Sequence, residues 1–405
     1  MVPSGWRKVV LNDVSERVAV GLATSVTEAY TDVGIPIIRN LNIKKGYFDD
    51  SKMLYLSEEF SSKHPNKRVK AGDVITVHTG SNVGLTCVVP EEYNLAQTFT
   101  TLIVTPKAKD LDSWFLNYVL NSDYGEYQAL RLVVGGGKGN LNTSDFKIYP
   151  LLLPPLSEQR KIAKILSTWD KAISTTERLI DNSKQQKKAL MQQLLTGKKR
   201  LLDDSGKTFE SEWDYVRAGN IFLTRSNKKH DSDLPILAIT QDQGAIPREF
   251  IDYNVSVTKE SISGYKVVEQ GDFIISLRSF QGGIEYSRYK GICSPAYVIL
   301  YPKIKIVDAF YKYHLKSHIF IQAMKSRLEG IRDGKIISYK YFSEIKLPKP
   351  SLEEQQKIAS VLTNADKEIE LLEQQLADLK QEKKALMQQL LTGKRRVKVD
   401  DKEAA

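Results

Sequence analysis

Two stretches of this chain carry apolar side chains at alternating steps of four and three positions. The earlier stretch runs from Ile162 to Leu194, and the later one runs from Ile358 to Leu390. A period of 3.5 residues sustained over such a length is typical of a coiled coil. Each stretch therefore predicts a helix of roughly 40 residues, which is about 60 Å long at 1.5 Å per residue.

The two predicted helix seams differ in polarity, because the earlier one contains Thr176 and Ser183 where the later one is apolar. The earlier seam consists of Ile162, Leu166, Trp169, Ile173, Thr176, Ile180, Ser183, Lys187, Leu190 and Leu194. The later seam consists of Ile358, Leu362, Ala365, Ile369, Leu372, Leu376, Leu379, Lys383, Leu386 and Leu390.

Prolines directly precede both predicted helices, and a Thr-Gly pair follows both. In the first copy we expect Ser157 to cap the helix, because its hydroxyl can accept a backbone N–H bond, and Glu158 to suit the positive first turn. We expect Gly197 and Gly393 to take the left-handed conformation that ends a helix, with cations after them.

The chain contains a long internal repeat. Residues 187–198 and 383–394 are twelve identical residues, and the match extends back to Glu158-Gln159 and Glu354-Gln355 at an offset of 196. Such a repeat indicates a tandem duplication. We expect the two helices to pair with each other as an antiparallel coiled coil, since a pseudo-two-fold axis closes such a pair. The alternative is two separate amphipathic helices, each packed on its own domain.

The segments before the two helices are more weakly related. Both contain a Gly-Asp pair that opens an apolar run, at 72–77 and at 271–276, and an earlier strand start, at 34–39 and at 233–238. Both then continue into a helical stretch, at about 111–130 and 307–328, and a glycine-bearing loop, at 135–139 and 330–334. This predicts an α+β chain in the order domain, helix, domain, helix. The expected boundaries are 1–150, 151–200, 201–345 and 346–397, with a charged tail at 398–405.

Composition narrows the class of protein. The start of the chain lacks the apolar core of a signal peptide, and no apolar run is long enough to span a membrane, so we expect a cytoplasmic protein. Cys87 and Cys293 lie in different halves and are expected to be buried free thiols rather than a disulfide or a zinc site.

The net charge of +10 is compatible with nucleic-acid binding. Residues 151–202, however, carry 11 basic and 4 acidic side chains, while residues 1–150 carry 16 of each. The globular segments would therefore have to bind DNA through local clusters of residues rather than through net charge.

The sequence shows no catalytic motif. Neither an Asn-Pro-Pro-Tyr-like methyltransferase motif nor a Rossmann glycine fingerprint is present. Residues 205–208 resemble the end of a phosphate loop, but they follow a helix and lack the upstream glycine, which favours a linker. His314 and His318 are four residues apart without a third ligand, which favours ordinary helix positions. We expect no catalytic residue, metal or cofactor in this chain.

These features together resemble the specificity subunit of type I restriction-modification enzymes. The resemblance rests on two variable domains, each followed by a long helix that opens with proline and Glu-Gln and closes with Leu-Leu-Thr-Gly. The segments 156–166 and 188–197 are characteristic of that family. The resemblance covers essentially the whole chain, and the polar seam positions of the first helix are a departure that makes the helix pairing less apolar.

The resemblance implies a function without catalysis by this chain. Each globular part would be a target-recognition domain that reads one half of a bipartite, asymmetric site in double-stranded DNA. The paired helices would set the spacing and dock two methyltransferase subunits, which would bind S-adenosylmethionine themselves and modify an adenine in each half-site. Motor-nuclease subunits would join them to cleave unmodified DNA.

Two alternatives remain open at the level of sequence. One is a recognition subunit of a type II system whose nuclease and methyltransferase are fused in one partner chain. The other is a structural coiled-coil adaptor without a role on DNA, which predicts no salt-sensitive binding to a duplex.

Direct reading of bases needs Arg, Lys, Asn and Gln on loops that enter the major groove. Three pairs of loops at matched positions in the two halves offer such side chains. In the first half the candidates are Arg39, Asn40, His78, Ser81, Asn82, Lys138, Asn140 and Asn142. In the second half they are Thr240, Gln241, Arg278, Ser279, Gln281, Arg332, Lys335, Tyr339 and Lys340. Any one of these loops could instead be a polar hairpin tip.

Overall fold

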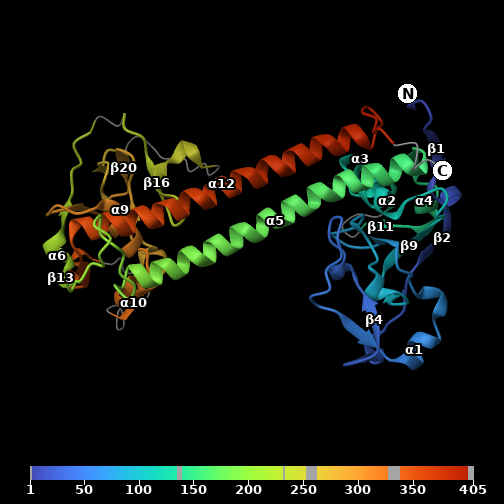
Figure 1. Ribbon diagram of the computed structural model, residues 1–405, viewed down its shortest axis with the longest axis horizontal. Coiled ribbons are helices and arrows are strands. Elements are labelled where there is room, and N and C mark those ends of the chain that lie inside the picture. The colour runs from blue at the N-terminus through green and yellow to red at the C-terminus, as the bar shows by residue number, and fades with distance from the viewer. Residues whose placement is uncertain (1, 135–138, 231–232, 252–261, 327–337, 400–405) are drawn as a thin grey trace. The chain divides into compact units, whose positions relative to one another are not determined.

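The computed structural model describes residues 2–134, 139–230, 233–251, 262–326 and 338–399. The chain divides into two compact units. Unit 1 consists of Met1–Glu177 and Gln375–Ala405, and unit 2 of Arg178–Gln374. The two long helices, α5 (Leu156–Leu194) and α12 (Leu352–Leu390), are each shared between the units. Figure 1 shows both as continuous ribbons.

Unit 1 contains a four-stranded antiparallel sheet in the order β2-β9-β6-β7. Its strands are β2 (Ser15–Val20), β9 (Thr101–Pro106), β6 (Val74–Val77) and β7 (Thr86–Val88). A second sheet has the order β3 (Tyr30–Thr31), β5 (Leu54–Leu56), β4 (Ile35–Ile38) and β8 (Gln97–Thr98), with β4 and β8 parallel. Unit 1 also contains two separate antiparallel strand pairs. They are β1 (Arg7–Val10) with β12 (Pro150–Leu153), and β10 (Val133–Val134) with β11 (Asn140–Leu141).

Unit 2 repeats the first of these sheets. Its order is β14 (Phe222–Arg225), β21 (Val298–Pro302), β18 (Phe273–Ile275) and β19 (Glu285–Tyr286), again antiparallel. The pair β13 (Asp214–Arg217) with β22 (Lys346–Lys349) matches β1 with β12. In place of the second sheet stand two separate antiparallel pairs, β15 (Leu237–Thr240) with β16 (Gly244–Pro247) and β17 (Lys266–Val268) with β20 (Gly291–Cys293).

Three of the shorter helices correspond between the units, namely α2 with α9, α3 with α10 and α4 with α11. Unit 1 has α1 (Glu58–Ser62), α2 (Ser113–Leu120), α3 (Asp123–Leu132) and α4 (Thr143–Lys147). Unit 2 has α6 (Ala218–Ile221), α8 (Ser279–Gly282), α9 (Asp308–His314), α10 (His318–Ser326) and α11 (Tyr339–Ser343). Each helical stretch expected from the sequence is in fact two helices, because Ser122 and Ser317 each accept a backbone N–H bond and start a new helix.

Each unit buries the start of one long helix together with the end of the other. The core of unit 1 includes Ile162 and Leu166 of α5 and Leu390 of α12. The core of unit 2 includes Ile358 of α12 and Leu194 of α5. Burying a side chain of this size contributes roughly 1.5–3 kcal/mol. The antiparallel pairing is therefore built into both cores.

The heptad seam of both helices is confirmed by burial, since every seam position is buried or half-buried. Ion pairs show the antiparallel direction within each unit. In unit 1 Lys383 pairs with Asp170, and Lys380 pairs with Glu177. Residue numbers therefore increase along one helix while they decrease along the other. The predicted α+β fold with paired helices is thus confirmed.

The polar residues of the first seam have partners. The Thr176 hydroxyl donates to the Ala172 carbonyl oxygen at 2.9 Å, and the Ser183 hydroxyl donates to Glu368 Oε1 at 3.3 Å. Lys187 pairs with Asp366. Each of these polar side chains in the seam therefore has a hydrogen-bond or ion-pair partner.

The expected helix ends are right in one respect and wrong in another. Gly197 and Gly393 both have φ of +70°, as a left-handed helix end requires. The expected cap, Ser157, lies inside α5 instead, because the helix begins one residue earlier and the Pro155 carbonyl accepts its first bonds. In the second copy Ser351 does cap α12, accepting the Glu354 N–H at 3.2 Å.

Candidate nucleic-acid interface

The three candidate loops of unit 1 lie together. The Asn40 side-chain amide donates to the Thr79 carbonyl oxygen at 3.1 Å, which joins the loop after β4 to the loop after β6. His78 Nδ1 lies 2.8 Å from the Leu141 carbonyl oxygen, and Thr79 forms a bridge with Asn140. Segments far apart in the sequence thus form one polar surface.

The side chains on this surface differ in exposure and in how much of their hydrogen-bonding capacity is used within the protein. Ser81, Asn82, Asn140 and Asn142 are exposed. Arg39 is half-buried, and its guanidinium donates to the Lys52 carbonyl oxygen at 2.6 Å, so part of its bonding capacity holds the loop. Lys138 and most of the Gly135–Gly139 loop lie outside the described residues.

Unit 2 brings its first two candidate loops together as well. Gln241 Nε2 lies 3.5 Å from the Arg278 carbonyl oxygen. The Lys316 ammonium binds the Gln241 carbonyl oxygen at 2.5 Å and Glu285 Oε2 at 2.6 Å, and so ties this loop to the sheet. Arg278 and Gln281 are exposed beside Gln241. They are the side chains best placed to reach a ligand.

Three of the predicted residues in unit 2 have structural partners. The Thr240 hydroxyl donates to the Gly244 carbonyl oxygen at 3.0 Å and closes the β15–β16 turn. Ser279 is buried and accepts the Ser276 N–H at 2.9 Å. The Tyr339 hydroxyl donates to the Phe222 carbonyl oxygen at 2.8 Å while its ring packs on the core. Lys340 is exposed, whereas Arg332 and Lys335 lie outside the described residues.

The Gly-Asp turns fix the strands that carry the second loop of each unit. Asp73 accepts the Lys70 N–H, and Asp272 accepts the Glu269 N–H, both at 2.8 Å. Burial raises the pKa of Asp272 to about 6, although Arg225 lies 3.0 Å away and opposes the shift. Burial raises the pKa of Asp73 in the same way.

The Glu-Gln pair at the start of each long helix ties the helices to the globular parts. In unit 1 the buried Glu158 carboxylate accepts the Trp6 indole N–H at 3.1 Å and two guanidinium bonds from Arg396, each 2.7 Å long. In unit 2 Glu354 receives the Trp213 indole N–H at 2.8 Å and two guanidinium bonds from Arg200 at 2.6 and 2.8 Å. We call these the Glu158 and Glu354 junctions.

A second contact of three residues joins both helices to each globular part. In unit 1 the Tyr118 hydroxyl donates to Asp170 at 2.7 Å, and Lys383 binds the same carboxylate at 2.5 Å. In unit 2 the Tyr313 hydroxyl donates to Asp366 at 2.6 Å, where Lys187 also binds. Burial and the neighbouring carboxylate raise the pKa of both tyrosines, so they stay protonated.

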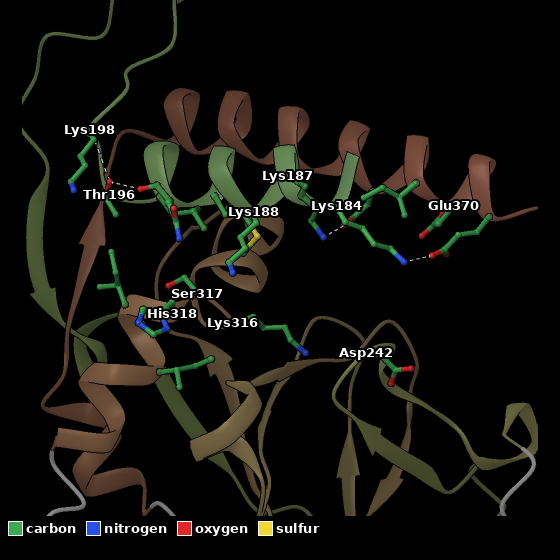
Figure 2. A pocket seen from close by; sticks show the side chains of 18 residues that line it. Lys184, Lys187, Lys188, Thr196, Lys198, Asp242, Lys316, Ser317, His318 and Glu370 are labelled. Carbon is green, nitrogen blue, oxygen red and sulfur yellow. Dashed lines mark hydrogen bonds and ion pairs between the residues drawn. The ribbon is translucent and has the colours of Figure 1, made fainter. Parts of the chain in front are cut away.

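Each unit has a groove between its short helices and the C-terminal part of one long helix, which is α5 in unit 2 and α12 in unit 1. In unit 2 it has a volume of about 820 Å³, and Figure 2 shows Lys188 of α5 facing the turn that carries Ser317 and His318. The groove of unit 1 is smaller, at about 350 Å³, and there Lys384 binds Asp123 at 3.1 Å.

Seven residues in and just after the long helices line both grooves. They are Lys184, Lys187, Lys188, Met191, Gln192, Leu195 and Thr196 in unit 2, and Lys380, Lys383, Lys384, Met387, Gln388, Leu391 and Thr392 in unit 1. The groove of unit 2 is also lined by Asp366, Ile369, Glu370 and Glu373 of α12.

Comparison with known proteins identifies the family. The model of the type I restriction modification DNA specificity domain matches residues 3–183 and again residues 210–381, which together make up most of the chain. The chain belongs to this family of type I restriction-modification specificity subunits.

Relatives of this specificity chain span its full length. It is 27% identical to the putative type I restriction enzyme MjaX specificity subunit of Methanocaldococcus jannaschii, over 98% of this chain and 95% of the relative. It is 28% identical to the MjaVIII specificity subunit of the same organism, over 87% of each. The fold is similar to that of the type I restriction-modification S subunit from M. genitalium, with a TM-score of 0.58, 17% identity and 96% of each chain covered.

Further features of this specificity chain can be read from the described residues. No helix among them is long and apolar enough to cross a membrane, and no group of three or more His, Cys, Asp or Glu within them could hold a metal ion. Cys87 and Cys293 are both free and buried, as expected. The pKa of each thiol is raised by burial to about 12.

Sequence reasoning missed the residues that bond to the long helices. Trp6 and Trp213 stand near the starts of the two halves of the chain, and their bonds to Glu158 and Glu354 were not predicted. The signal was present, since an arginine follows the Thr-Gly pair in both copies, at Arg200 and Arg396. The tyrosines of the second contact stand in α2 and α9, whose sequences gave no comparable signal.

Proposed function

We propose that this chain is the DNA-recognition subunit of a type I restriction-modification complex, in which each globular part reads one half of a bipartite site. The observation that carries this proposal is the grouping of exposed polar side chains from separate loops in both units. Asn82 and Asn140 in unit 1, and Arg278 and Gln281 in unit 2, are the strongest candidates for base contacts. Arg pairs with guanine, and Asn or Gln with adenine, in the major groove.

The difference between the two loop sets supports an asymmetric site. Unit 1 offers mainly amide and hydroxyl groups, whereas unit 2 offers a guanidinium at Arg278. Two surfaces of different chemistry on matching sheets would select different bases. Phosphate contacts would position each unit, and these loops would provide the specificity.

We further propose that the paired helices set the spacing between the half-sites and dock two methyltransferase subunits. Support comes from the two grooves, which share seven identical residues in and just after the long helices although their other walls differ. Two copies of one partner would meet these seven side chains twice. The adenine methylation, with S-adenosylmethionine, and any cleavage would then be the work of partner subunits in the cytoplasm.

The test is to sequence the methylated adenines of a strain that carries this chain and its methyltransferase partner. We expect one two-part motif with a fixed spacer. A variant with one extra heptad in each helix, inserted between residues 177 and 178 and between 374 and 375, keeps the seam in register and leaves each unit intact. It adds about 10 Å.

A DNA turn of about 34–36 Å holds 10–10.5 base pairs, so the spacer should grow by at most about three base pairs. The bases read in each half should stay the same. A heptad added to α5 alone is the control, and it should abolish methylation because the helices no longer match. An active double insertion with an unchanged spacer would refute the spacing role. Co-purification of one large fused partner would favour a type II system.

A further inference from the structure

The outward face of α5 in unit 1 carries three cations on one side of the helix. Arg160, Lys164 and Lys171 are exposed. They are spaced by four and seven residues, which keeps them within about 40° of one another at 100° per residue. Lys164 and Lys171 lie about 160–200° from the neighbouring seam positions, opposite α12.

Among the described residues none of these cations forms an ion pair, although Arg160 lines a pocket together with Glu16, Asp73 and Asp112. The neighbours of Lys171 one helical turn away all carry hydroxyl groups, and the hydroxyls of Ser167 and Thr168 bond back to the Lys164 carbonyl oxygen at 2.9 and 3.0 Å. Within the described residues we find no carboxylate within ion-pair distance of the three cations. The carboxylates closest in sequence, Glu158 and Asp170, are bound by Arg396 and Lys383.

Folding of the helix does not require this arrangement. Arg160 and Lys164 are like charges at i and i+4, a spacing that costs a helix about 0.2–0.5 kcal/mol. The duplicate helix keeps only one of the three cations, since α12 has Gln356, Ser360 and Lys367 at these positions.

The two helices differ in charge as a whole. Helix α5 carries 8 basic and 4 acidic residues, and α12 carries 5 basic and 8 acidic ones. Part of this difference lies on the outward face of α5, whereas seven of the residues that line the grooves are identical in the two copies.

We propose that this face of α5 binds the phosphate backbone of the duplex that lies between the two half-sites. The inference rests on the proposed function and adds a contact that is independent of base sequence. From Arg160 to Lys171 the cations span about 16 Å at 1.5 Å per residue, and duplex DNA offers a negative charge about every 1.7 Å of its axis. Lys, Arg, Ser and Thr are the side chains that contact phosphates.

A protein partner fits this face less well than DNA. Stable protein interfaces have an apolar core and are depleted in lysine. The outward positions 160, 164, 167, 168, 171, 174 and 175 include no apolar residue. The grooves, in contrast, contain Met191 and Leu195 in unit 2 and their counterparts in unit 1, so partner subunits have a separate apolar surface.

The experiment measures how the affinity of the complex with its methyltransferase subunits for a duplex depends on salt. Removing one lysine or arginine that neutralises a phosphate lowers the log–log slope by about 0.9. The triple variant R160Q/K164Q/K171Q should therefore lower the slope by about 2 to 3 and leave the methylated motif unchanged. The charge-preserving variant R160K/K164R/K171R should keep the wild-type slope. K367Q on α12 is the matched control, and we expect no change in its slope.

Two results would overturn the inference. One is a wild-type slope in the triple variant. The other is loss of the methyltransferase subunits from that variant on size-exclusion chromatography, which would make the face a protein-docking surface. A wild-type complex that binds DNA but methylates no two-part site would refute the proposed function, while the slope comparison would still decide the role of the α5 face.

Discussion

Units 1 and 2 share one sheet and their contacts with the long helices, and they differ in their remaining strands and loops. Both have a four-stranded sheet of the same order, a strand pair just before the long helix, and a Glu junction to an arginine that follows the other helix. Unit 1 adds a second four-stranded sheet where unit 2 has two separate strand pairs. The shared residues are those that bond to the helices, and the loops that differ bond mostly to one another.

The largest difference in stability between the two units is expected from substitutions at the Glu158 and Glu354 junctions. Arg200→Ala leaves the buried Glu354 carboxylate without its cation and should destabilise unit 2 by about 3–5 kcal/mol. Arg396→Ala should cost less in unit 1, because the Arg396 side chain is 42% exposed against 19% for Arg200.

Hydrogen exchange in strands β22 and β12 would report the two units separately. Lys199→Ala, an exposed neighbour, is the control and should leave both units unchanged. Equal losses in the two units would show that exposure of the arginine does not decide the cost.

The next effect concerns recognition by unit 2 alone. Arg278→Ala should relax the methylated motif in one half-site, since a bidentate contact from arginine to guanine is worth about 1–3 kcal/mol. Methylome sequencing measures this, with Lys305→Ala, an exposed residue outside the candidate loops of the same unit, as the control. A motif that changed in both halves, or in neither, would contradict the role of Arg278.

A smaller loss is expected at the tyrosines that bond both helices. Tyr313→Phe and Tyr118→Phe each remove one hydrogen bond to a carboxylate, worth about 1.5 kcal/mol at the lower end for a charged partner. Because the distances from hydroxyl to carboxylate are similar, 2.7 Å for Tyr118 and 2.6 Å for Tyr313, we expect similar shifts in the urea midpoints of the two units, although the Tyr313 hydroxyl also contacts the Thr363 hydroxyl at 3.3 Å. A shift in only one would show that the contacts are not equivalent.

The smallest effect is a pH dependence confined to unit 2. Burial lowers the pKa of His314 to about 4, and its equivalent in unit 1 is Val119. Below about pH 6.5 the unfolded chain binds a proton at this histidine that the folded one does not, so the contribution of His314 to stability falls as pH drops from about 6.5 towards 4. The raised pKa of Asp272 acts in the opposite direction in both wild type and variant, so only their difference reports His314. His314→Val should recover on the order of 1 kcal/mol at pH 5.5.

Unfolding in urea at pH 7.5 and 5.5 measures this gain for the variant against wild type, and Val119→Ala, which adds no titrating group, is the control. If wild type and His314→Val lost the same stability between the two pH values, His314 would not be the group responsible.

The sequence was sufficient to predict the parts of the fold that repeat at a fixed period. The seam from Ile358 to Leu390 identified the paired helices, and the Gly-Asp pairs at 72 and 271 identified central strands. The predicted cap at Ser157 was wrong. The prediction rested on the preference of serine for the position before a helix, but the helix begins earlier, and its first backbone N–H groups bond to the Pro155 carbonyl oxygen. The stretch at 111–130 was predicted as one helix but is two. The second helix begins after Ser122, whose hydroxyl accepts the Gly125 N–H, and a single bond of this kind leaves little trace in the sequence pattern.

The candidate site was predicted as loops but not as bonded partners. Position in the repeat was enough to select the loops at 78–82 and 277–281, which the structure brings close to the earlier loops. It could not separate Arg278, which is exposed, from Ser279, which is buried in the same turn, because that depends on how α8 turns. DNA binding by these residues stays a prediction.

The division of the chain into units has a consequence for how it is made. Unit 2 is one continuous segment, whereas the core of unit 1 needs Leu390 and Leu391 from near the end of the chain. On a ribosome, where domains fold as their residues emerge, unit 2 can complete its core first. The larger segment of unit 1 then keeps the apolar face of α5 uncovered until the end of α12 has emerged. Unit 1 therefore completes its core after unit 2, although most of its residues are translated earlier.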